Sequence, residues 1–403
     1  MNRRGFLRGA AVATGAGSFG LAGCLEQLGF EEESGWNTPA LVDDRPENAV
    51  YVPAAEEEMA SYGTATEGRY AVRLTYTFPH RFWLVGDGSS RVTSEGTERV
   101  EVETDDSMHL MLTTWDRETG VVLPVDASID LRRDGESVTR FNPWPMLSQR
   151  MGFHYGDNVS LPEEGEYTSR IRVGPVSADR TGHLEGALEE SAELEVPFEY
   201  AHSKVTSLGF DRVDRDRWGE PGAVDPMDHG HDHGEGGDHD QGESGDGSHE
   251  DHGDHGSGGD GETTPPAMTG PAVDELPGES LGTERSADAA ISALRTDLER
   301  FAGGDSDSTG AYLAVLPRTP YNDVPIPFTS FSATVERDGS TLVEDARLEE
   351  TLDHEFGHHY GVGLESLESG DEVTVSIDTP PVVSRHDGYE TAFFEFEDVT
   401  YTV

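Results

Sequence analysis

The chain has 403 residues, of which 80 are acidic and 28 are lysine or arginine, so its formal charge is −52. A chain this acidic repels the phosphates of nucleic acid, and it has no run of about 20 apolar residues that could span a bilayer. These features argue against nucleic-acid binding and exclude a polytopic membrane protein. Lys204 is the only lysine, so nearly all the positive charge is arginine. An excess of acidic residues with almost no lysine keeps a protein hydrated and soluble at molar salt, and it indicates a halophilic source.

Residues 1–23 resemble an export signal. Arg3 and Arg4 precede a stretch of small and apolar residues, and this stretch ends at Leu21-Ala22-Gly23-Cys24. The combination is similar to a twin-arginine signal joined to a lipoprotein cleavage box. It predicts lipidation of Cys24, a tether over residues 24–40, and an extracytoplasmic protein that is bound to the cell membrane through its lipid anchor.

Residues 41–218 carry the strand signals of a first domain. Short runs with period-two alternation occur at residues 70–76, 128–131, 167–171 and 194–200, and turn residues separate them. This pattern is typical of an antiparallel β-sandwich.

Residues 219–267 form a segment rich in His, Asp and Gly, and seven of the 16 histidines lie there. With so few apolar residues the segment has no core to bury, so we expect a disordered linker. Its histidines and carboxylates could chelate metal loosely or serve as a solvated spacer, and the sequence leaves both readings open.

Residues 268–403 form a second domain that repeats the first. Residues 131–135, 153–156 and 164–171 match residues of the second domain in the same order, at offsets of 204 to 206. Three ordered matches predict two copies of one sandwich. The second copy is expected to be degenerate, with a helix over residues 286–301.

Several short segments of the first domain together resemble the periplasmic iron-transport accessory lipoproteins. These segments are Ser107-Met108-His109-Leu110, Pro143-Trp144-Pro145-Met146, His154-Tyr155-Gly156-Asp157-Asn158-Val159, Tyr167-Thr168 and Arg180-Thr181-Gly182-His183. The resemblance covers about residues 50–200. It implies an immunoglobulin-like fold, so the whole chain is predicted to be mainly β, with two immunoglobulin-like antiparallel β-sandwich domains joined by the linker.

The same resemblance implies a copper site and a role in ferrous-iron uptake. The implied copper ligands are His109, Met146, His154 and His183. Three imidazoles and a thioether favour copper over magnesium or calcium and accommodate both oxidation states of copper. The family's His-Leu-Glu reads His109-Leu110-Met111 here, so the carboxylate of the family's iron-associated second site is missing.

Other side chains are secondary candidates for metal ligands. They are Met59, His80, Met111 and, as the counterpart of His154 in the second copy, His359. The histidines at 354, 358, 359 and 386 are considered only as a separate site within the second domain. The predicted function is that of a non-enzymatic, lipid-anchored protein that binds copper or iron and assists iron transport. An iron permease and a second copy of the chain are its candidate partners.

The alternative function is that of a zinc metallohydrolase. His354-Glu355-Phe356-Gly357-His358 matches the HExxH motif, which places two zinc ligands on one face of a helix, and residues 344–353 before it could be helical. Three features count against this alternative. The third ligand of the longer motif falls on Leu364, and Gly357 inside a helix costs about 1 kcal/mol. The repeat also aligns this segment with residues 149–156, which are expected to form a loop.

Overall fold

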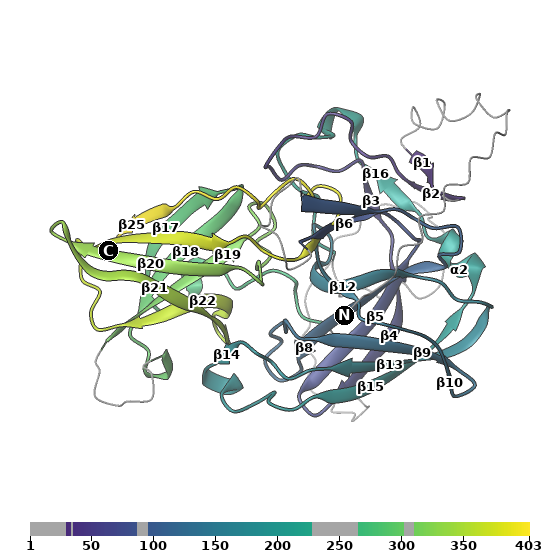
Figure 1. Cartoon of the computed structure of the whole chain (residues 1–403), viewed down its shortest axis with the longest axis horizontal. Coiled ribbons are helices and arrows are strands. Elements are labelled where there is room, and N and C mark those ends of the chain that lie inside the picture. The colour runs from purple at the N-terminus through teal and green to yellow at the C-terminus, as the bar shows by residue number, and fades with distance from the viewer. Residues whose placement is uncertain (1–29, 34, 87–95, 228–264, 302–309) are drawn as a thin grey trace, which may run out of the picture.

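The computed structural model describes residues 30–33, 35–86, 96–227, 265–301 and 310–403 (Figure 1). The predicted signal over residues 1–23, the lipidation site Cys24 and residues 228–264 of the predicted linker lie outside the described residues. The described chain is mainly β, as predicted, and folds into two sandwich domains that lie side by side.

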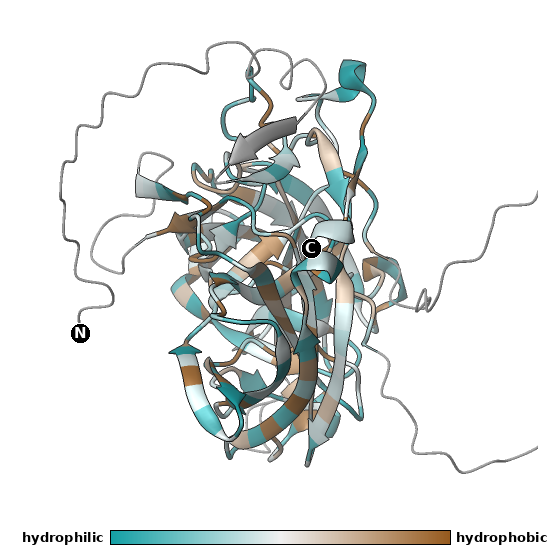
Figure 2. Ribbon diagram, turned by 90° about the vertical axis from the view of Figure 1, so that its right-hand side faces the viewer, coloured by the Kyte–Doolittle hydropathy of each residue, from teal (hydrophilic) through white to brown (hydrophobic). Residues whose placement is uncertain are grey.

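The first domain packs a four-stranded sheet against an eight-stranded sheet. The four-stranded sheet has the order β10 (Glu136–Phe141), β9 (Ala127–Arg133), β13 (Gly165–Val173) and β15 (Ala192–Tyr200). The eight-stranded sheet has the order β4 (Ala60–Glu67), β5 (Tyr70–Thr77), β8 (Met108–Asp116), β12 (Gly152–Val159), β11 (Trp144–Ser148), β24 (Ser384–Arg385), β6 (Phe82–Val85) and β7 (Thr97–Val100). Strand β15 is buried at every second residue, and the same alternation of apolar and polar residues is visible along strands in Figure 2.

The second domain is built from strands that run in the order β17 (Glu279–Ser286), β18 (Ala289–Thr296), β19 (Ala311–Arg318), β22 (Gly357–Leu364), β21 (Ser340–Asp353), β20 (Ser330–Arg337), β23 (Glu372–Thr379) and β25 (Val399–Thr402). Strand β21 belongs to both layers, because its first part pairs with β20 and its last part pairs with β22.

Short elements complete the described chain. They are β1 (Phe30–Glu33), β2 (Trp36–Pro39), β3 (Ala55–Glu57), β14 (Asp179–Arg180), α2 (His202–Ser207), β16 (Phe210–Arg212), and the single-turn helices η3 (Gly182–Leu184), η4 (Arg215–Arg217), η5 (Val273–Glu275) and η6 (Glu299–Phe301).

The two domains are copies of one topology, as the repeat predicts. The order β4-β5-β8-β12-β11 in the first domain corresponds to β17-β18-β19-β22-β21 in the second, and β9-β13-β15 corresponds to β20-β23-β25. Residue pairing agrees, since Met146 pairs with His154 in one copy and Thr351 pairs with His359 in the other. The two residues of the second pair each lie 205 positions after their counterparts in the first pair.

Each domain contributes a two-residue strand to the sheet of the other. Strand β24 of the second domain runs parallel to β11, where Ser384 pairs with Met146. Strand β14 of the first domain runs parallel to β21, where Asp179 pairs with Thr351. A single cluster of buried apolar side chains extends through both domains. The two copies therefore form one packed unit.

The helix expected over residues 286–301 is wrong. This segment instead contains the end of β17, a turn at Ala287 and Asp288, which both have positive φ, and then β18 and η6. Strand β18 is covered by β17 on one edge and β19 on the other. This sheet pairing overrides the high helix propensity of its alanines, because tertiary context outweighs intrinsic propensity.

The chain is folded beyond the predicted limits of the first domain. In the predicted tether, β1 and β2 pair with each other and Arg81 donates to the carbonyl of Pro39. In the predicted linker, Val224 is buried and its N–H donates to the side chain of Gln149. Both predicted segments therefore contain ordered structure at the ends that adjoin the first domain.

Candidate metal site

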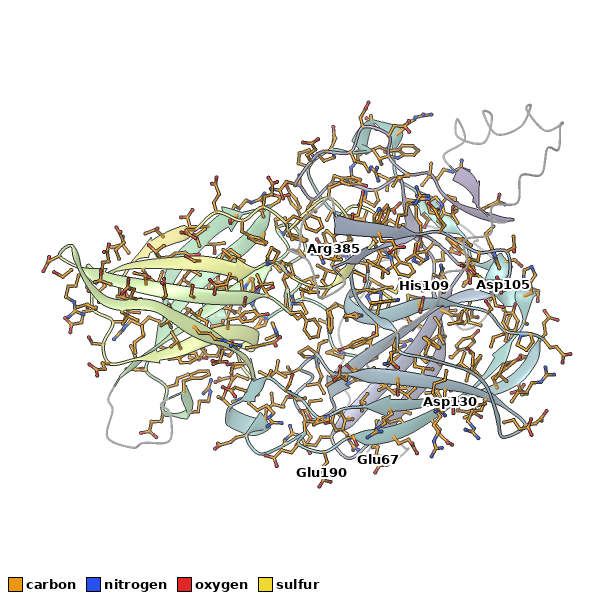
Figure 3. The ribbon with its side chains drawn as sticks, in the orientation of Figure 1. Glu67, Asp105, His109, Asp130, Glu190 and Arg385 are labelled. Carbon is orange, nitrogen blue, oxygen red and sulfur yellow. The ribbon has the colours of Figure 1, made fainter. Side chains whose placement is uncertain are left out.

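Histidine side chains converge where the second domain's strand β24 joins the first domain's sheet. His109 lies on β8, His154 on β12 and Met146 on β11, and all three side chains are buried. His386 follows β24 directly, and its neighbour Arg385 is fully buried beside the first domain (Figure 3). His80 lies two residues before β6. The site is therefore assembled from both domains.

The polar atoms of these side chains point toward one another. His386 Nε2 lies 3.3 Å from Met146 Sδ, and the rings of His154 and His386 have centroids 5.3 Å apart. His80, His109 and His386 each offer a ring nitrogen within 4.8 Å of the others. Gly156 marks the centre of this group, because a Cβ built there would lie 2.7 Å from His109 Nε2 and 3.0 Å from Met146 Sδ.

Hydrogen bonds to the Nδ1 atoms of His109 and His154 determine which ring nitrogen carries the hydrogen. Asn158 donates its amide to the carbonyl of His80 at 2.9 Å, so its Oδ1 accepts from His109 Nδ1 at 2.9 Å. His154 Nδ1 donates to the carbonyl of Gly152 at 3.1 Å. A neutral imidazole that carries its hydrogen on Nδ1 has a bare lone pair on Nε2. The Nε2 atoms of His109 and His154 are buried and have no hydrogen-bond partner among the described residues.

Burial keeps these imidazoles in the form that binds metal. Desolvation lowers the pKa of His109 to about 3, against a smaller opposite effect of the Asn158 hydrogen bond. Desolvation lowers the pKa of His154 to about 4, and it lowers the pKa values of His80 and His386 well below their ordinary value. All four rings are therefore neutral at pH 7, as metal coordination requires.

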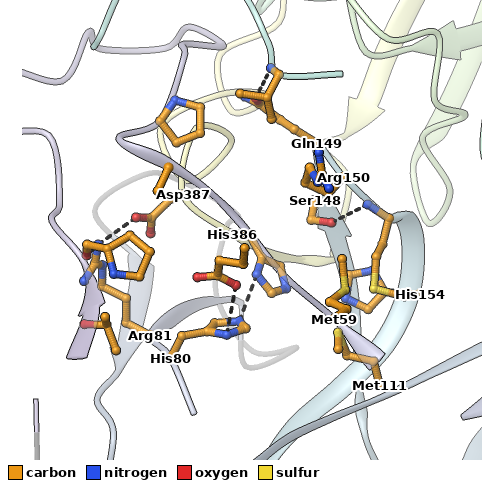
Figure 4. A pocket seen from close by; sticks show the side chains of 17 residues that line it. Met59, His80, Arg81, Met111, Ser148, Gln149, Arg150, His154, His386 and Asp387 are labelled. Carbon is orange, nitrogen blue, oxygen red and sulfur yellow. Dashed lines mark hydrogen bonds and ion pairs between the residues drawn. The ribbon is translucent and has the colours of Figure 1, made fainter. Parts of the chain in front are cut away.

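A small cavity of about 60 Å³ adjoins the histidines (Figure 4). Glu57, Met59, Met111, His154 and His386 are among its lining residues. Glu57 Oε2 lies 3.2 Å from His80 Nδ1, and burial raises the pKa of Glu57 to about 8. Two thioethers and one carboxyl group thus lie beside the imidazole cluster.

The structure brings together His109, Met146 and His154, with the secondary candidates His80, Met59 and Met111 around them. It does not bring His183 to this site. His183 is exposed, and its ring stacks on His354 of the second domain with centroids 4.0 Å apart. The predicted ligand set is therefore corrected at His183.

Sequence reasoning missed His386 as a member of the first domain's site. The exchanged strands explain why, because Asp179 of β14 and Ser384 of β24 occupy matching positions in the two copies. By this register the counterpart of His386 is Thr181. The repeat as aligned from sequence instead paired His183 with Tyr389, so it gave no reason to compare His386 with the first domain's site. No local pattern around residue 386 indicates that it enters the other domain.

The second copy does not retain the donor set. By strand register, Tyr312 replaces His109 and Thr351 replaces Met146. Thr181 replaces His386 on the exchanged strand. Of the four positions, only that of His154 keeps a histidine, which is His359. Tyr312 O–H lies 3.2 Å from His359 Nε2, and the ring of Phe301 stacks on Tyr312 at 4.3 Å. A phenol and a phenyl ring fill this region, so the second copy is degenerate at the site, and His359 is not part of the metal cluster.

The HExxH segment does not have the geometry of a zinc protease. Residues 354–356 form the turn between β21 and β22, and Gly357 has a φ of 64°. His358 Nε2 contacts Glu350 Oε1 at 2.7 Å, whereas His354 stacks on His183. The segment therefore lacks the helix that could carry an HExxH motif, and the local geometry that the zinc hydrolase alternative needs is not formed.

Comparisons with known proteins identify a family model for the second domain only. Residues 274–402 match a domain of unknown function, DUF7350. No curated protein matches the chain. Among solved structures, a copper-bound variant of FetP from uropathogenic Escherichia coli matches with 16% identity and a TM-score of 0.27, covering 36% of this chain and 93% of that chain. The as-isolated FetP of the same strain matches with the same identity and TM-score and is covered over 97% of its length.

The described residues contain no helix that is long and apolar enough to cross a membrane.

Proposed function

We propose that the chain is a non-enzymatic, extracytoplasmic metal-binding protein that holds a copper ion between its two domains. The proposed ligands are the Nε2 atoms of His109, His154 and His386 and the sulfur of Met146. The observation that carries the proposal is the pair of buried Nε2 atoms on His109 and His154, which have no hydrogen-bond partner among the described residues and belong to rings beside a third imidazole and a thioether. Unsatisfied buried acceptors are costly unless a cation occupies the space between them.

The donor set favours copper among the available metals. Magnesium and calcium prefer oxygen ligands, and a thioether adds little to a zinc site, whereas three imidazoles and a thioether suit both cuprous and cupric ions. Ferrous iron is the second candidate, because imidazole also binds it and the nearby Glu57 could supply an oxygen ligand.

The wider role follows from the N-terminal residues and the resemblance stated above. We propose that the chain is exported through its twin-arginine signal, lipidated at Cys24 and retained at the outer face of the membrane of a halophile. There it would assist iron transport, with an iron permease as its partner, as a single chain or as a homodimer.

The test is the metal content of the purified full chain at high salt, after loading with copper and then dialysis against a weak chelator. We expect about one tightly held copper ion per chain, lost in His154→Ala and in His386→Ala. His183→Ala is the matched control, because this histidine is exposed and distant from the cluster, and it should keep its copper. Deletion of residues 228–264 measures any loose binding by the acidic, histidine-rich segment.

Two results would contradict the proposal. One is copper that survives both His154→Ala and His386→Ala. The other is copper that disappears only when residues 228–264 are deleted, which would assign the metal to that segment. Loading with ferrous iron under anaerobic conditions, on the same variants, distinguishes the two candidate metals.

A further inference from the structure

The contacts of His386 differ from those of the other proposed ligands. His109 and His154 are oriented by an amide and a carbonyl of their own domain. His386 comes from the other domain, and its Nδ1 lies 3.2 Å from His80 Nε2. His80 Nδ1 in turn lies 3.3 Å from the carbonyl of Phe78 and 3.2 Å from Glu57 Oε2. A chain of polar contacts thus leads from Glu57 through His80 to His386.

This chain assigns the hydrogens of both rings. A carbonyl can only accept, so the hydrogen of His80 lies on Nδ1, where the carbonyl of Phe78 accepts it and Glu57 Oε2 lies 3.2 Å away as a second acceptor. His80 Nε2 is then an acceptor, and the hydrogen-bond partner at 3.2 Å must be Nδ1–H of His386. The remaining nitrogen of His386, Nε2, carries a lone pair and is the atom that lies 3.3 Å from Met146 Sδ.

We propose that Glu57 and His80 are positioning residues that fix the tautomer and orientation of His386, and so make metal binding depend on contact between the two domains. This inference rests on the proposed function. His80, which the sequence suggests as a secondary ligand, is thereby assigned to support a ligand. Acidic and imidazole partners of ligating histidines commonly act in this way, by raising ligand basicity and holding the ring.

A backbone hydrogen bond and an ion pair of the next residue place the segment that carries His386, but neither contact orients its ring. The N–H of His386 donates to the carbonyl of Leu147, and the flanking Asp387 pairs with Arg81 at 2.7 Å. These contacts fix the backbone of the segment. Rotation of the imidazole is then limited by His80 on one side and Met146 on the other, so loss of His80 removes the orienting contact without removing the ligand.

The experiment compares wild type, His80→Phe and Glu57→Gln, with Glu58→Gln as the matched control. Glu58 follows Glu57 in the chain, but its carboxylate accepts from the N–H of Gly209 and not from the site. Cuprous affinity is measured on the full chain by competition with a chromophoric chelator. We expect affinity to fall about 10- to 100-fold in His80→Phe and about 10-fold in Glu57→Gln, with no change in Glu58→Gln.

Two further measurements separate positioning from ligation and from folding. Long-range ¹H–¹⁵N correlation spectra of the copper-free protein should show His386 with its hydrogen on Nδ1 in wild type and with a mixture of tautomers in His80→Phe. X-ray absorption of loaded His80→Phe should show as many nitrogen ligands as wild type. If circular dichroism shows that His80→Phe does not fold, Glu57→Gln decides the question.

The outcomes distinguish this inference from the proposed function. If wild type binds no copper, or if His154→Ala and His386→Ala both bind it as tightly as wild type, the proposed function itself fails. If wild type binds copper and both His80→Phe and Glu57→Gln bind it as tightly as Glu58→Gln, only the positioning role is overturned. Loss of one nitrogen ligand in His80→Phe also overturns it, because His80 would then bind the metal directly.

Discussion

Replacement of His359 by phenylalanine should remove part of the protein's sensitivity to acid. His359 is fully buried, and desolvation lowers its pKa to about 4 from an ordinary value of 6.5. Its Nδ1 donates to the carbonyl of Gly357 at 3.2 Å, and Tyr312 O–H lies 3.2 Å from its Nε2. The folded chain therefore holds a neutral ring, whereas the unfolded chain binds a proton as soon as the pH falls below 6.5.

The sign and size of the effect follow from this difference. Between pH 6.5 and pH 4 the unfolded state binds the proton and the folded state does not, so stability decreases as the pH falls. Each pH unit in that window costs about 1.4 kcal/mol, which amounts to about 2 kcal/mol between pH 7 and pH 5. The contribution is complete above pH 6.5 and is lost as the pH falls toward 4.

The assay is urea unfolding of the copper-free protein at constant high salt, at pH 7 and at pH 5. Burial raises the pKa values of Glu57 to about 8 and of Glu390 to about 7, and these groups favour the folded state as the pH falls. The free energy of unfolding of wild type therefore contains opposite contributions from these carboxyl groups and from the buried histidines. Because His359→Phe retains the carboxyl groups, their contribution cancels in the difference between wild type and the variant. We expect this difference to change by about 2 kcal/mol in favour of the variant at pH 5.

An exposed histidine provides the control for this measurement. His183→Phe makes the same substitution at an exposed position, so it measures what replacing a histidine by phenylalanine does where no buried ring is removed. A His359→Phe difference that is the same at pH 7 and at pH 5 would refute the reasoning, because it would mean that the folded protein accommodates the protonated ring of His359.

Three further predictions concern the site and the domain contact. Gly156→Ala should weaken copper binding by at least about 100-fold in a chelator titration, because its Cβ would lie within 3.0 Å of two ligand atoms, whereas Gly363→Ala, with no atom within 4 Å, should bind normally. Met146→Leu keeps the bulk but removes the soft ligand, so cuprous affinity should fall about tenfold more than cupric affinity and voltammetry should show the reduction potential lowered by about 60 mV. Asp353→Asn breaks the buried ion pair with Arg300 at 2.9 Å and should reduce the free energy of unfolding by about 3 kcal/mol in urea.

The sequence predicts the fold class and the repeat because both depend on local patterns. Alternation of buried and exposed residues is retained in strands such as β15, and the matched turns keep their spacing in both copies. The error at residues 286–301 has the opposite origin. The alanines in Ser286 to Thr296 favour a helix by their own propensity, but pairing with two neighbouring strands determines their conformation.

The candidate site also contains residues that the sequence indicated and one that it did not. The family resemblance implied His109, Met146 and His154, and these residues lie on adjacent strands of one sheet. His386 could not be predicted, because it reaches the site through a crossing between domains that no alternation or motif encodes. His183 failed for the related reason that the chain near it crosses into the opposite domain.

The placement of β24 has a consequence for how the chain matures. This strand lies between β11 and β6, so within the described residues strands β6 and β7 pair with the rest of their sheet only through residues 384–385. The first domain therefore cannot complete its sheet while the chain is being synthesised, until almost the whole polypeptide is available. Closing a loop of this length is slow relative to local pairing. The histidine cluster is therefore complete only when both copies have folded and packed together, and a chain truncated before residue 384 would lack His386.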